Sequence, residues 1–329
     1  MSKARQSRRG FIKGAGLAAG SVLGSTMLPE PLGAQRGQGR GPAPAAAGSA
    51  SLSKGGRLRA ALATGEPLVM PVVQSILLTR LCEMEGFKAG FLGGSGKAAL
   101  NGLPNNSIQT IQEVIDYERE IMQNTDLPIC ADGENGGGSP VTVYRTVQQL
   151  ERGGAAMILI EDSTGPESEY GSNGVAMASP DLMVNRIKAA VDARKDPNVM
   201  ILMRTDRPSK GHSEQETLDV CSACSAAGAD AFFISGFSLD QQQKAKGILK
   251  KPLMVGSSGP AEDWHSKGVD MAFYHIDTIG IGAMYMALKE IKATGKFTEA
   301  AKLQLPRDVA AKVIDQAGWL ARAKKYGVV

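Results

Sequence analysis

Aromatic residues and histidines are scarce in this chain: Phe, Trp and Tyr make up 5% of it, and it contains three histidines. Proteins that bind nucleic acid rely on stacked aromatic side chains or on runs of Lys and Arg that follow the phosphates. Residues 48–329 contain no long run of Lys or Arg, so neither device is present there. The apolar run from Gly14 to Leu28 is too short and too rich in glycine for a good transmembrane helix.

The first 47 residues have the order of features found in an export signal. Ser7-Arg-Arg-Gly-Phe-Ile-Lys13 precedes the apolar run, and Ala45-Ala-Ala47 is a candidate cleavage site. We therefore expect residues 1–47 to be a twin-arginine signal peptide with its linker, residues 48–329 to be one domain, and the mature protein to be periplasmic or otherwise extracytoplasmic. The alternative is a basic disordered leader that only resembles such a signal.

The net charge depends on this segment. Residues 1–47 carry seven basic residues and one acidic residue, so their removal changes the formal net charge from +4 to −2. The basicity of the whole chain therefore indicates nothing about nucleic acid.

From Leu58 onward, short apolar runs alternate with amphipathic runs. This alternation predicts a parallel sheet, and eight strands close naturally into a (β/α)8 barrel; a doubly wound open sheet is the alternative. The predicted strands are Leu68–Val73, Ala89–Leu92, Pro128–Ala131, Met157–Ile160, Val199–Met203, Ala231–Ser235, Pro252–Val255 and Met271–Tyr274. The predicted helices include Ile108–Gln123, Val141–Arg152, Pro180–Arg194, Glu214–Ala227 and Ile276–Ala293. Further helices over Thr298–Lys325 would cover the barrel or pack on a partner subunit.

Charged side chains follow three successive predicted strands. Asp132 and Glu134 follow one strand, Glu161 and Asp162 end the next, and Arg204 ends the third. The carboxyl ends of barrel strands meet at one mouth, where such folds build their active sites. These charges are therefore predicted to face one another.

An ordered set of short segments resembles the isocitrate lyase and phosphoenolpyruvate mutase superfamily, which includes methylisocitrate lyase, phosphonopyruvate hydrolase and oxaloacetate decarboxylase-like enzymes. The segments are Glu66-Pro-Leu-Val-Met-Pro71, Gly86-Phe-Lys-Ala-Gly90, Gly102-Leu-Pro104, Leu127-Pro-Ile-Cys-Ala-Asp132, Val143-Tyr-Arg-Thr146, Leu150-Glu-Arg-Gly-Gly-Ala155, Ile160-Glu-Asp162 and Arg204-Thr-Asp206. The resemblance implies a (β/α)8 barrel, a tetramer that exchanges its last helix, and a divalent cation that stabilises an enolate of a small 2-oxo or 2-hydroxy acid.

The resemblance also implies a cation site. Asp132 would bind Mg²⁺ or Mn²⁺ directly, whereas Glu134, Glu161 and Asn105 would hold water molecules on the ion. Hard divalent cations prefer oxygen ligands, and Mg²⁺ usually keeps several waters beside one or two carboxylates. The alternative is that these acids only cap the N-termini of the helices that follow.

Substrate contacts are predicted at Arg204, Gly93 and Gly94. A guanidinium binds a carboxylate through two parallel hydrogen bonds, and glycines allow backbone amides to approach a ligand closely. The superfamily normally has serine where Gly93 stands, so one hydroxyl contact is missing. The alternative for Arg204 is a structural ion pair with Asp206 or Glu161.

The segment after the fourth strand departs from the superfamily pattern. In the isocitrate and methylisocitrate lyases of the superfamily that this chain resembles, a cysteine in this loop serves as the general acid. Here Ser163–Val175 contains no Cys, His, Lys or Arg. We therefore do not expect isocitrate to be cleaved in the usual manner. The acid and base candidates are Glu161, Tyr170 and His275, and the alternative for the loop is a plain surface segment.

Cys221-Ser-Ala-Cys224 has the spacing of a redox or metal pair. It lies among alanines in a predicted amphipathic helix, which favours small buried thiols.

Two functions fit these observations. The first is a Mg²⁺-dependent lyase, or a decarboxylase or hydrolase acting through the same enolate chemistry, on a small 2-oxo or 2-hydroxy acid. The second is a non-catalytic extracytoplasmic binding protein that keeps the metal and carboxylate site. Asp132, Glu161 and Arg204 favour the enzyme, and the altered loop favours the binding protein.

Overall fold

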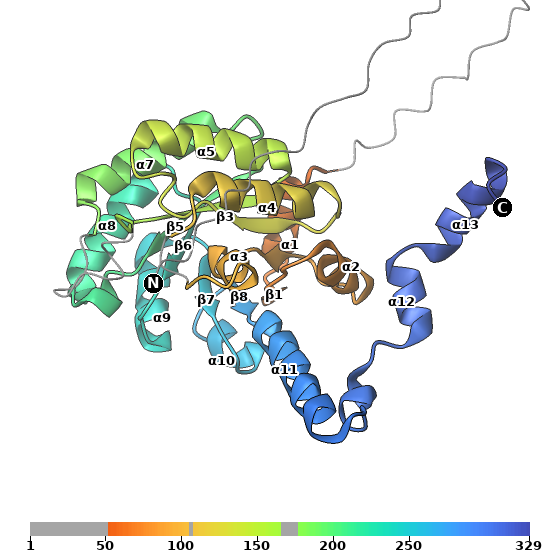
Figure 1. Cartoon of the computed structure of the whole chain (residues 1–329). Helices are drawn as coiled ribbons and strands as arrows, with labels where there is room; N and C mark the ends of the chain where they lie inside the picture. Colours follow the sequence, from red (N-terminus) through yellow and green to blue (C-terminus); the bar gives the residue numbers. More distant parts are fainter. Residues whose placement is uncertain (1–51, 105–107, 166–176) are drawn as a thin grey trace, which may run out of the picture. The chain divides into compact units, whose positions relative to one another are not determined.

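A computed structural model describes residues 52–104, 108–165 and 177–329, and this part of the chain forms a parallel barrel (Figure 1). Its eight strands are β1 (Leu68–Pro71), β2 (Gly90–Phe91), β3 (Ile129–Asp132), β4 (Met157–Glu161), β5 (Met200–Thr205), β6 (Ala231–Ile234), β7 (Leu253–Gly256) and β8 (Met271–Tyr274). They pair in the order β1-β8-β7-β6-β5-β4-β3-β2. A parallel bridge between Val72 and Phe91 joins the two ends. The (β/α)8 prediction is confirmed, and the open-sheet alternative is wrong.

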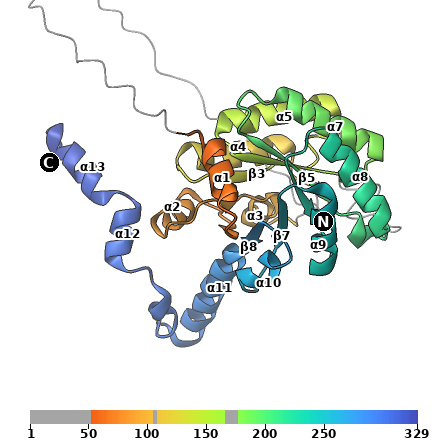
Figure 2. The same cartoon turned by 180° about the vertical axis from the view of Figure 1, so that it is seen from behind.

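Helices surround the strands on the outside, as Figures 1 and 2 show from opposite sides. The α-helices are α1 (Lys54–Ala63), α2 (Ile76–Met84), α3 (Gly94–Leu100), α4 (Ile111–Gln123), α5 (Pro140–Gly153), α7 (Pro180–Ala193), α8 (Glu214–Ala226), α9 (Leu239–Leu249), α10 (Ala261–His265), α11 (Ile276–Thr294), α12 (Arg307–Val313) and α13 (Gln316–Lys325). Short 3-10 turns occur at η1 (Pro208–Lys210) and η2 (Ala300–Leu303).

Local sequence signals explain where the helices begin. α4 begins after Thr110, whose side chain accepts the amide of Glu113 while Glu113 accepts the amide of Thr110. This capping box explains why the helix begins three residues later than predicted. α5 follows Ser139 with proline at its first position and ends at Gly154, which has a φ of 99°.

Side chains alternate between the inside and the outside of the barrel along each strand. In β4, Met157 and Leu159 belong to the core inside the barrel, whereas Ile158 and Ile160 pack against the surrounding helices. The same alternation in β5 places Met200 and Leu202 inside. Because a strand has a period of two residues, the next inward positions are Glu161 and Arg204. The register pairs these two residues directly.

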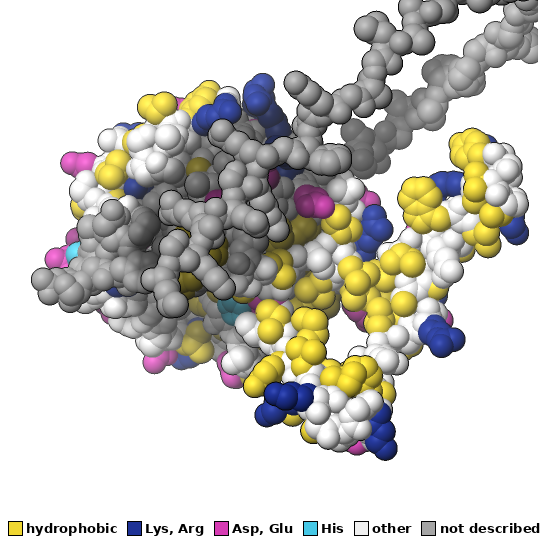
Figure 3. Space-filling view, in the orientation of Figure 1, with side chains coloured by type: hydrophobic (Ala, Val, Ile, Leu, Met, Phe, Trp, Pro, Cys, Tyr) yellow, Lys and Arg dark blue, Asp and Glu magenta, His cyan; other side chains and the backbone are white. Residues whose placement is uncertain are grey.

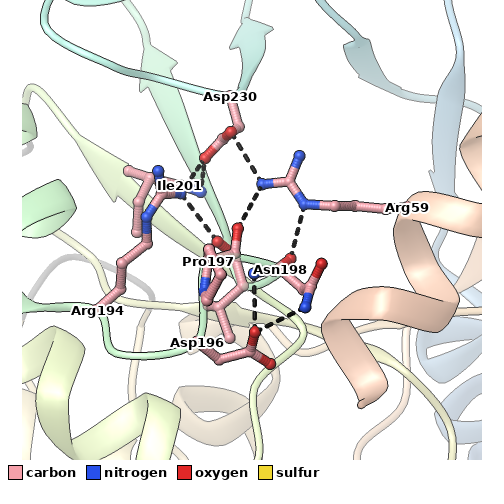
Figure 4. A network of polar contacts seen from close by, with 8 residues as sticks. Arg59, Arg194, Asp196, Pro197, Asn198, Ile201 and Asp230 are labelled. Carbon is pink, nitrogen blue, oxygen red and sulfur yellow. Dashed lines mark hydrogen bonds and ion pairs between the residues drawn. The ribbon is translucent and has the colours of Figure 1, made fainter. Parts of the chain in front are cut away.

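The end of the barrel opposite the mouth is closed by α1. Leu58 of this helix is fully buried in the inner core. Beside it, Asp230 forms ion pairs with Arg59 at 3.0 Å and with Arg194 at 2.5 Å, and it accepts the amide of Ile201 at 2.9 Å (Figure 4). This network joins α1 and the end of α7 to the starts of β5 and β6.

The C-terminal helices leave a large apolar surface exposed. Of the 19 residues of α11, only Asp277 is buried, and Ile279, Met284 and Leu288 are 71%, 61% and 66% exposed. Figure 3 shows apolar side chains along this part of the chain. Helix α12 contacts α2, and the predicted helical tail is confirmed by η2, α12 and α13. No helix in the described ranges is long and apolar enough to cross a membrane.

Candidate functional site

A cavity of about 280 Å³ opens at the carboxyl ends of the strands. It is lined by Phe91, Gly93, Ser95, Asp132, Glu134, Glu161, Arg204, Phe233, Phe273 and His275. These residues come from the ends of β2, β3, β4, β5, β6 and β8 and from the turns that follow them. Six of the residues predicted from the sequence therefore lie around one space: Gly93, Asp132, Glu134, Glu161, Arg204 and His275.

Asp132 is the most firmly held of the acids. Its Oδ2 accepts the amide of Gly94 at 3.0 Å, and its Oδ1 accepts the amide of Glu134 at 3.0 Å. Its own amide donates to Oε1 of Glu118, a fully buried residue of α4, at 3.0 Å. Each oxygen of Asp132 keeps a second lone pair, so both can still bind an ion.

Glu134 has a left-handed backbone conformation, with a φ of 48°. Such a conformation is uncommon for a residue other than glycine and is typical of functional turns. Its carbonyl accepts the amide of Glu161 at 2.9 Å, and its amide donates to Asp132. The three acids are therefore fixed to one another through the backbone.

The side chain of Glu134 extends over Gly94. A Cβ atom at position 94 would lie 1.8 Å from Oε1 of Glu134, far inside the contact distance of real atoms. A side chain at position 94 would therefore displace the end of Glu134 from its present position. Its amide is engaged by Asp132, so in this structure Gly94 positions the acid, while Gly93 lines the cavity.

Glu161 and Arg204 form an ion pair across neighbouring strands. The distance from Arg204 Nη1 to Glu161 Oε2 is 3.3 Å, and Arg204 Nη2 lies 3.0 Å from Asp206 Oδ2. Burial raises the pKa of Glu161 to about 7; the charge of Arg204 opposes this rise and that of Asp132 adds to it. Arg204 therefore forms the structural ion pairs that were considered as its alternative role. Its side chain is nevertheless 28% exposed and lines the cavity.

The donor set of the cavity suits a hard cation. Asp132, Glu134 and Glu161 supply only oxygen atoms, and Arg204 is the one Lys or Arg among the described residues that line the cavity. When ionised, these three carboxylates outnumber the one guanidinium, and a divalent cation would balance the excess negative charge. Within the described ranges, no three His, Cys, Asp or Glu side chains are arranged to ligate one ion together. Mg²⁺ is commonly held by one or two carboxylates and several waters, and the oxygen atoms of these acids suit such an ion.

The other predicted residues lie apart or outside the described part. Asp162 points away from the cavity: it accepts a hydrogen bond from Thr205 at 2.6 Å and pairs with Arg207 at 3.2 Å. Asn105 and Tyr170 fall outside the described residues. His275 lines the cavity, and its ring is edge-on to Phe273 with centroids 5.5 Å apart.

Sequence reasoning missed Ser95, which lines the cavity at the start of α3, and two further groups. Phe91, Phe233 and Phe273 form an aromatic wall, in which the rings of Phe91 and Phe273 stack at 4.7 Å. Glu118 is the other, and burial raises its pKa well above the usual range. Its position among Val114, Ile115, Ile121 and Met122 on the buried face of α4 was a usable signal, because an acid rarely occupies an apolar stripe.

Cys221 and Cys224 are free and buried in α8. Burial raises the pKa of both thiols. The interpretation as small buried thiols is therefore confirmed.

A (β/α)8 barrel with acids and an arginine at its strand ends is the arrangement of a barrel enzyme. The family model described as phosphoenolpyruvate phosphomutase matches residues 58–292, and the chain belongs to this family, within the isocitrate lyase and phosphoenolpyruvate mutase superfamily. The predicted resemblance is confirmed.

Two curated relatives are similar to most of the domain. A 2-methylisocitrate lyase of Shewanella oneidensis is 32% identical over 250 residues, which cover 73% of this chain and 85% of the relative. An oxaloacetate decarboxylase of Rhodopseudomonas palustris is 36% identical over 210 residues, covering 63% and 72%.

Solved structures agree with the fold. A phosphoenolpyruvate phosphomutase from Streptomyces platensis subsp. rosaceus matches with a TM-score of 0.76 and 26% identity, covering 83% of this chain and 99% of the other. A phosphonopyruvate hydrolase in complex with oxalate and Mg²⁺ matches with a TM-score of 0.74 and 23% identity over 84% and 99%, a likeness of fold alone.

Proposed function

We propose that the protein is a Mg²⁺- or Mn²⁺-dependent lyase that cleaves a C–C or C–P bond, or removes a carboxylate, next to the carbonyl of a small 2-oxo or 2-hydroxy acid. The observation that carries this proposal is the cavity in which three fixed carboxylates face one arginine. Relatives named as a methylisocitrate lyase and as oxaloacetate decarboxylases support this class of reaction.

The dimensions and charges of the cavity favour a compact substrate. About 280 Å³ is below the usual range for drug-sized ligands. A substrate carboxylate would bind the outer N–H groups of Arg204, which are not all used by Glu161 and Asp206. Arg204 is the one Lys or Arg among the described residues that line the cavity, so a substrate with one or two carboxylates fits better than a tricarboxylate.

The chain's own residues would hold the cation and orient the reacting group. Asp132 would bind the ion directly, with Glu134 and Glu161 on its water molecules, and the bound ion would stabilise negative charge on the enolate oxygen. Arg204 would fix the carboxylate end of the substrate. Gly93 lines the same cavity, and a side chain there would press against the ring of Phe91.

Oxalate provides the first test, because it mimics a planar enolate. Calorimetry should detect oxalate binding that requires Mg²⁺ or Mn²⁺, and Asp132→Ala should abolish it while circular dichroism shows an intact fold. A panel of 2-oxo and 2-hydroxy acids, followed by loss of substrate, then identifies the reaction. Unchanged oxalate binding in folded Asp132→Ala would contradict the metal assignment, and no turnover of any acid would contradict the enzymatic one.

We also propose that copies of this chain assemble through α11, forming a tetramer with exchanged C-terminal helices. The exposed Ile279, Met284 and Leu288 support this, because an apolar surface of this kind is costly in water. Light scattering should give four times the chain mass, and Leu288→Glu should lower it. A monomer that stays soluble at high concentration would refute the assembly.

Export by the twin-arginine machinery is a further proposal, supported by Arg8 and Arg9 ahead of an apolar run. This route carries folded proteins, so the barrel would form before export. Changing both arginines to lysine should leave the precursor in the cytoplasm. Normal export of that variant would refute the assignment.

A further inference from the structure

His275 is held at the cavity with one ring nitrogen occupied. It lies between β8 and α11, and its Nδ1 is 3.2 Å from Oδ1 of Asp277. The edge-on contact with Phe273 fixes the plane of the ring. Because Asp277 occupies Nδ1, Nε2 is the nitrogen left for a ligand in the cavity. The side chain is 47% exposed, so it can exchange protons with water.

Asp277 is fixed from a second direction. Its Oδ2 accepts a hydrogen bond from Nε2 of Gln74 at 2.8 Å. The backbone carbonyl of Gln74 in turn accepts a hydrogen bond from the hydroxyl of Tyr117 at 2.8 Å. Gly96 leaves room for this amide, since a Cβ there would lie 3.3 Å from Gln74 Nε2. Gln74 and His275 thus hold the Asp277 carboxylate from two sides, and Tyr117 of α4 and Gly96 of α3 in turn contact Gln74.

A purely structural role would explain less of this arrangement. An acid in the first turn of α11 stabilises the helix dipole, but that effect needs no burial and no amide donor. Asp277 is only 7% exposed, and both of its oxygens are engaged. A carboxylate that orients one imidazole nitrogen is the arrangement that general acid–base catalysis uses.

We propose that His275 is the general acid that protonates the enolate carbon, and that Asp277, Gln74 and Tyr117 are positioning residues for it. The proposal rests on the proposed lyase function. In decarboxylation, the C–C bond to the departing carboxylate breaks and its electron pair forms the enolate. The enolate carbon then forms a C–H bond with the proton on Nε2, and the neutral imidazole regains a proton from solvent.

The other groups at the cavity suit this role less well. Glu161 is paired with Arg204, and with Asp132 and Glu134 it belongs to the proposed cation site. Arginine keeps its proton at all ordinary pH values. Among the described residues that line the cavity, His275 is therefore the one ionisable side chain outside the proposed cation site and the ion pairs of Arg204.

The test uses oxaloacetate and 3-methyloxaloacetate with Mg²⁺, in the full-length chain. In D₂O, the wild type should deliver deuterium to one face of the enolate, so that the 2-oxobutyrate, trapped by reduction, has a single configuration at C3. His275→Gln should give a racemic product, and its kcat for oxaloacetate should fall about 100-fold. Oxalate affinity should change less than threefold, and imidazole should restore activity to His275→Ala.

Controls separate catalysis from structure. His265→Gln, at a histidine outside the cavity whose ring contacts the carbonyl of Val269, should leave every readout unchanged. Asp277→Asn should lower kcat more than it changes KM, whereas Asp308→Asn, which removes the first-turn acid of α12, should alter neither.

The outcomes distinguish the two proposals. A single configuration retained by His275→Gln, with normal turnover, overturns the role of His275 and leaves the lyase function standing. A wild type that binds no oxalate and turns over no 2-oxo acid overturns the function and this inference with it.

Discussion

Removing the carboxylate of Glu161 should make the metal-free protein less sensitive to pH. Burial raises the pKa of this residue from 4.5 to about 7, so the folded chain keeps a proton that the unfolded chain releases between these values. The free energy of unfolding must therefore fall as pH rises through this window. A difference of this size corresponds to at most about 3 kcal/mol. Glu161→Gln cannot ionise and should lose this part of the pH dependence.

Urea unfolding at pH 5 and pH 8, with a chelator present, measures the effect. The decrease in the free energy of unfolding from pH 5 to pH 8 should be smaller in Glu161→Gln than in the wild type. In Glu66→Gln, whose side chain is exposed, this decrease should equal that of the wild type. Adding Mg²⁺ should reduce the loss in the wild type, because a cation favours the charged carboxylate. Equal pH dependence in the wild type and Glu161→Gln would show that Glu161 is not held protonated by its surroundings.

Three further changes test the site and its support. Gly94→Ala should weaken metal-dependent oxalate binding by about tenfold or more, because the new Cβ displaces the flexible end of Glu134, and it should not unfold the protein. Gly280→Ala is the control: its new Cβ would have no atom within 4 Å, so oxalate binding should stay unchanged. Arg204→Lys should weaken oxalate binding although the charge is kept, since an ammonium cannot form two parallel hydrogen bonds; equal calorimetric affinities would contradict this. Asp230→Asn should lower the free energy of unfolding by about 2 kcal/mol, between the values for exposed and buried ion pairs, and leave oxalate affinity unaltered.

The sequence was sufficient to predict the barrel because each apolar run is continuous and is separated from the next by a helical pattern. The strand ends were predicted less well: β1 ends at Pro71, two residues before the apolar run ends, and the bridge at Val72 continues the contact with β2. Helix α11 was predicted, but its exposure was not, because its apolar residues resemble those of a buried helix until the packing around it is known.

The site was predicted where residue type and strand position agree. Asp132, Glu161 and Arg204 follow from charges at inward positions of three strands. The partners of His275 could not be predicted in the same way. Gln74 is distant in sequence from Asp277, and only the closure of β8 against β1 brings the two residues together. The roles of Asn105 and Tyr170 stay predictions.

The contact between Glu134 and position 94 limits the order in which this site can change during evolution. With glutamate at 134, any side chain at 94 meets the carboxylate, so the glycine is constrained by a residue 40 positions away. Shortening Glu134 to aspartate would relax this constraint and only then permit a side chain at 94. The reverse order passes through a variant with a disturbed cation site. We therefore expect a side chain at position 94 more often among homologues with a shorter residue at position 134.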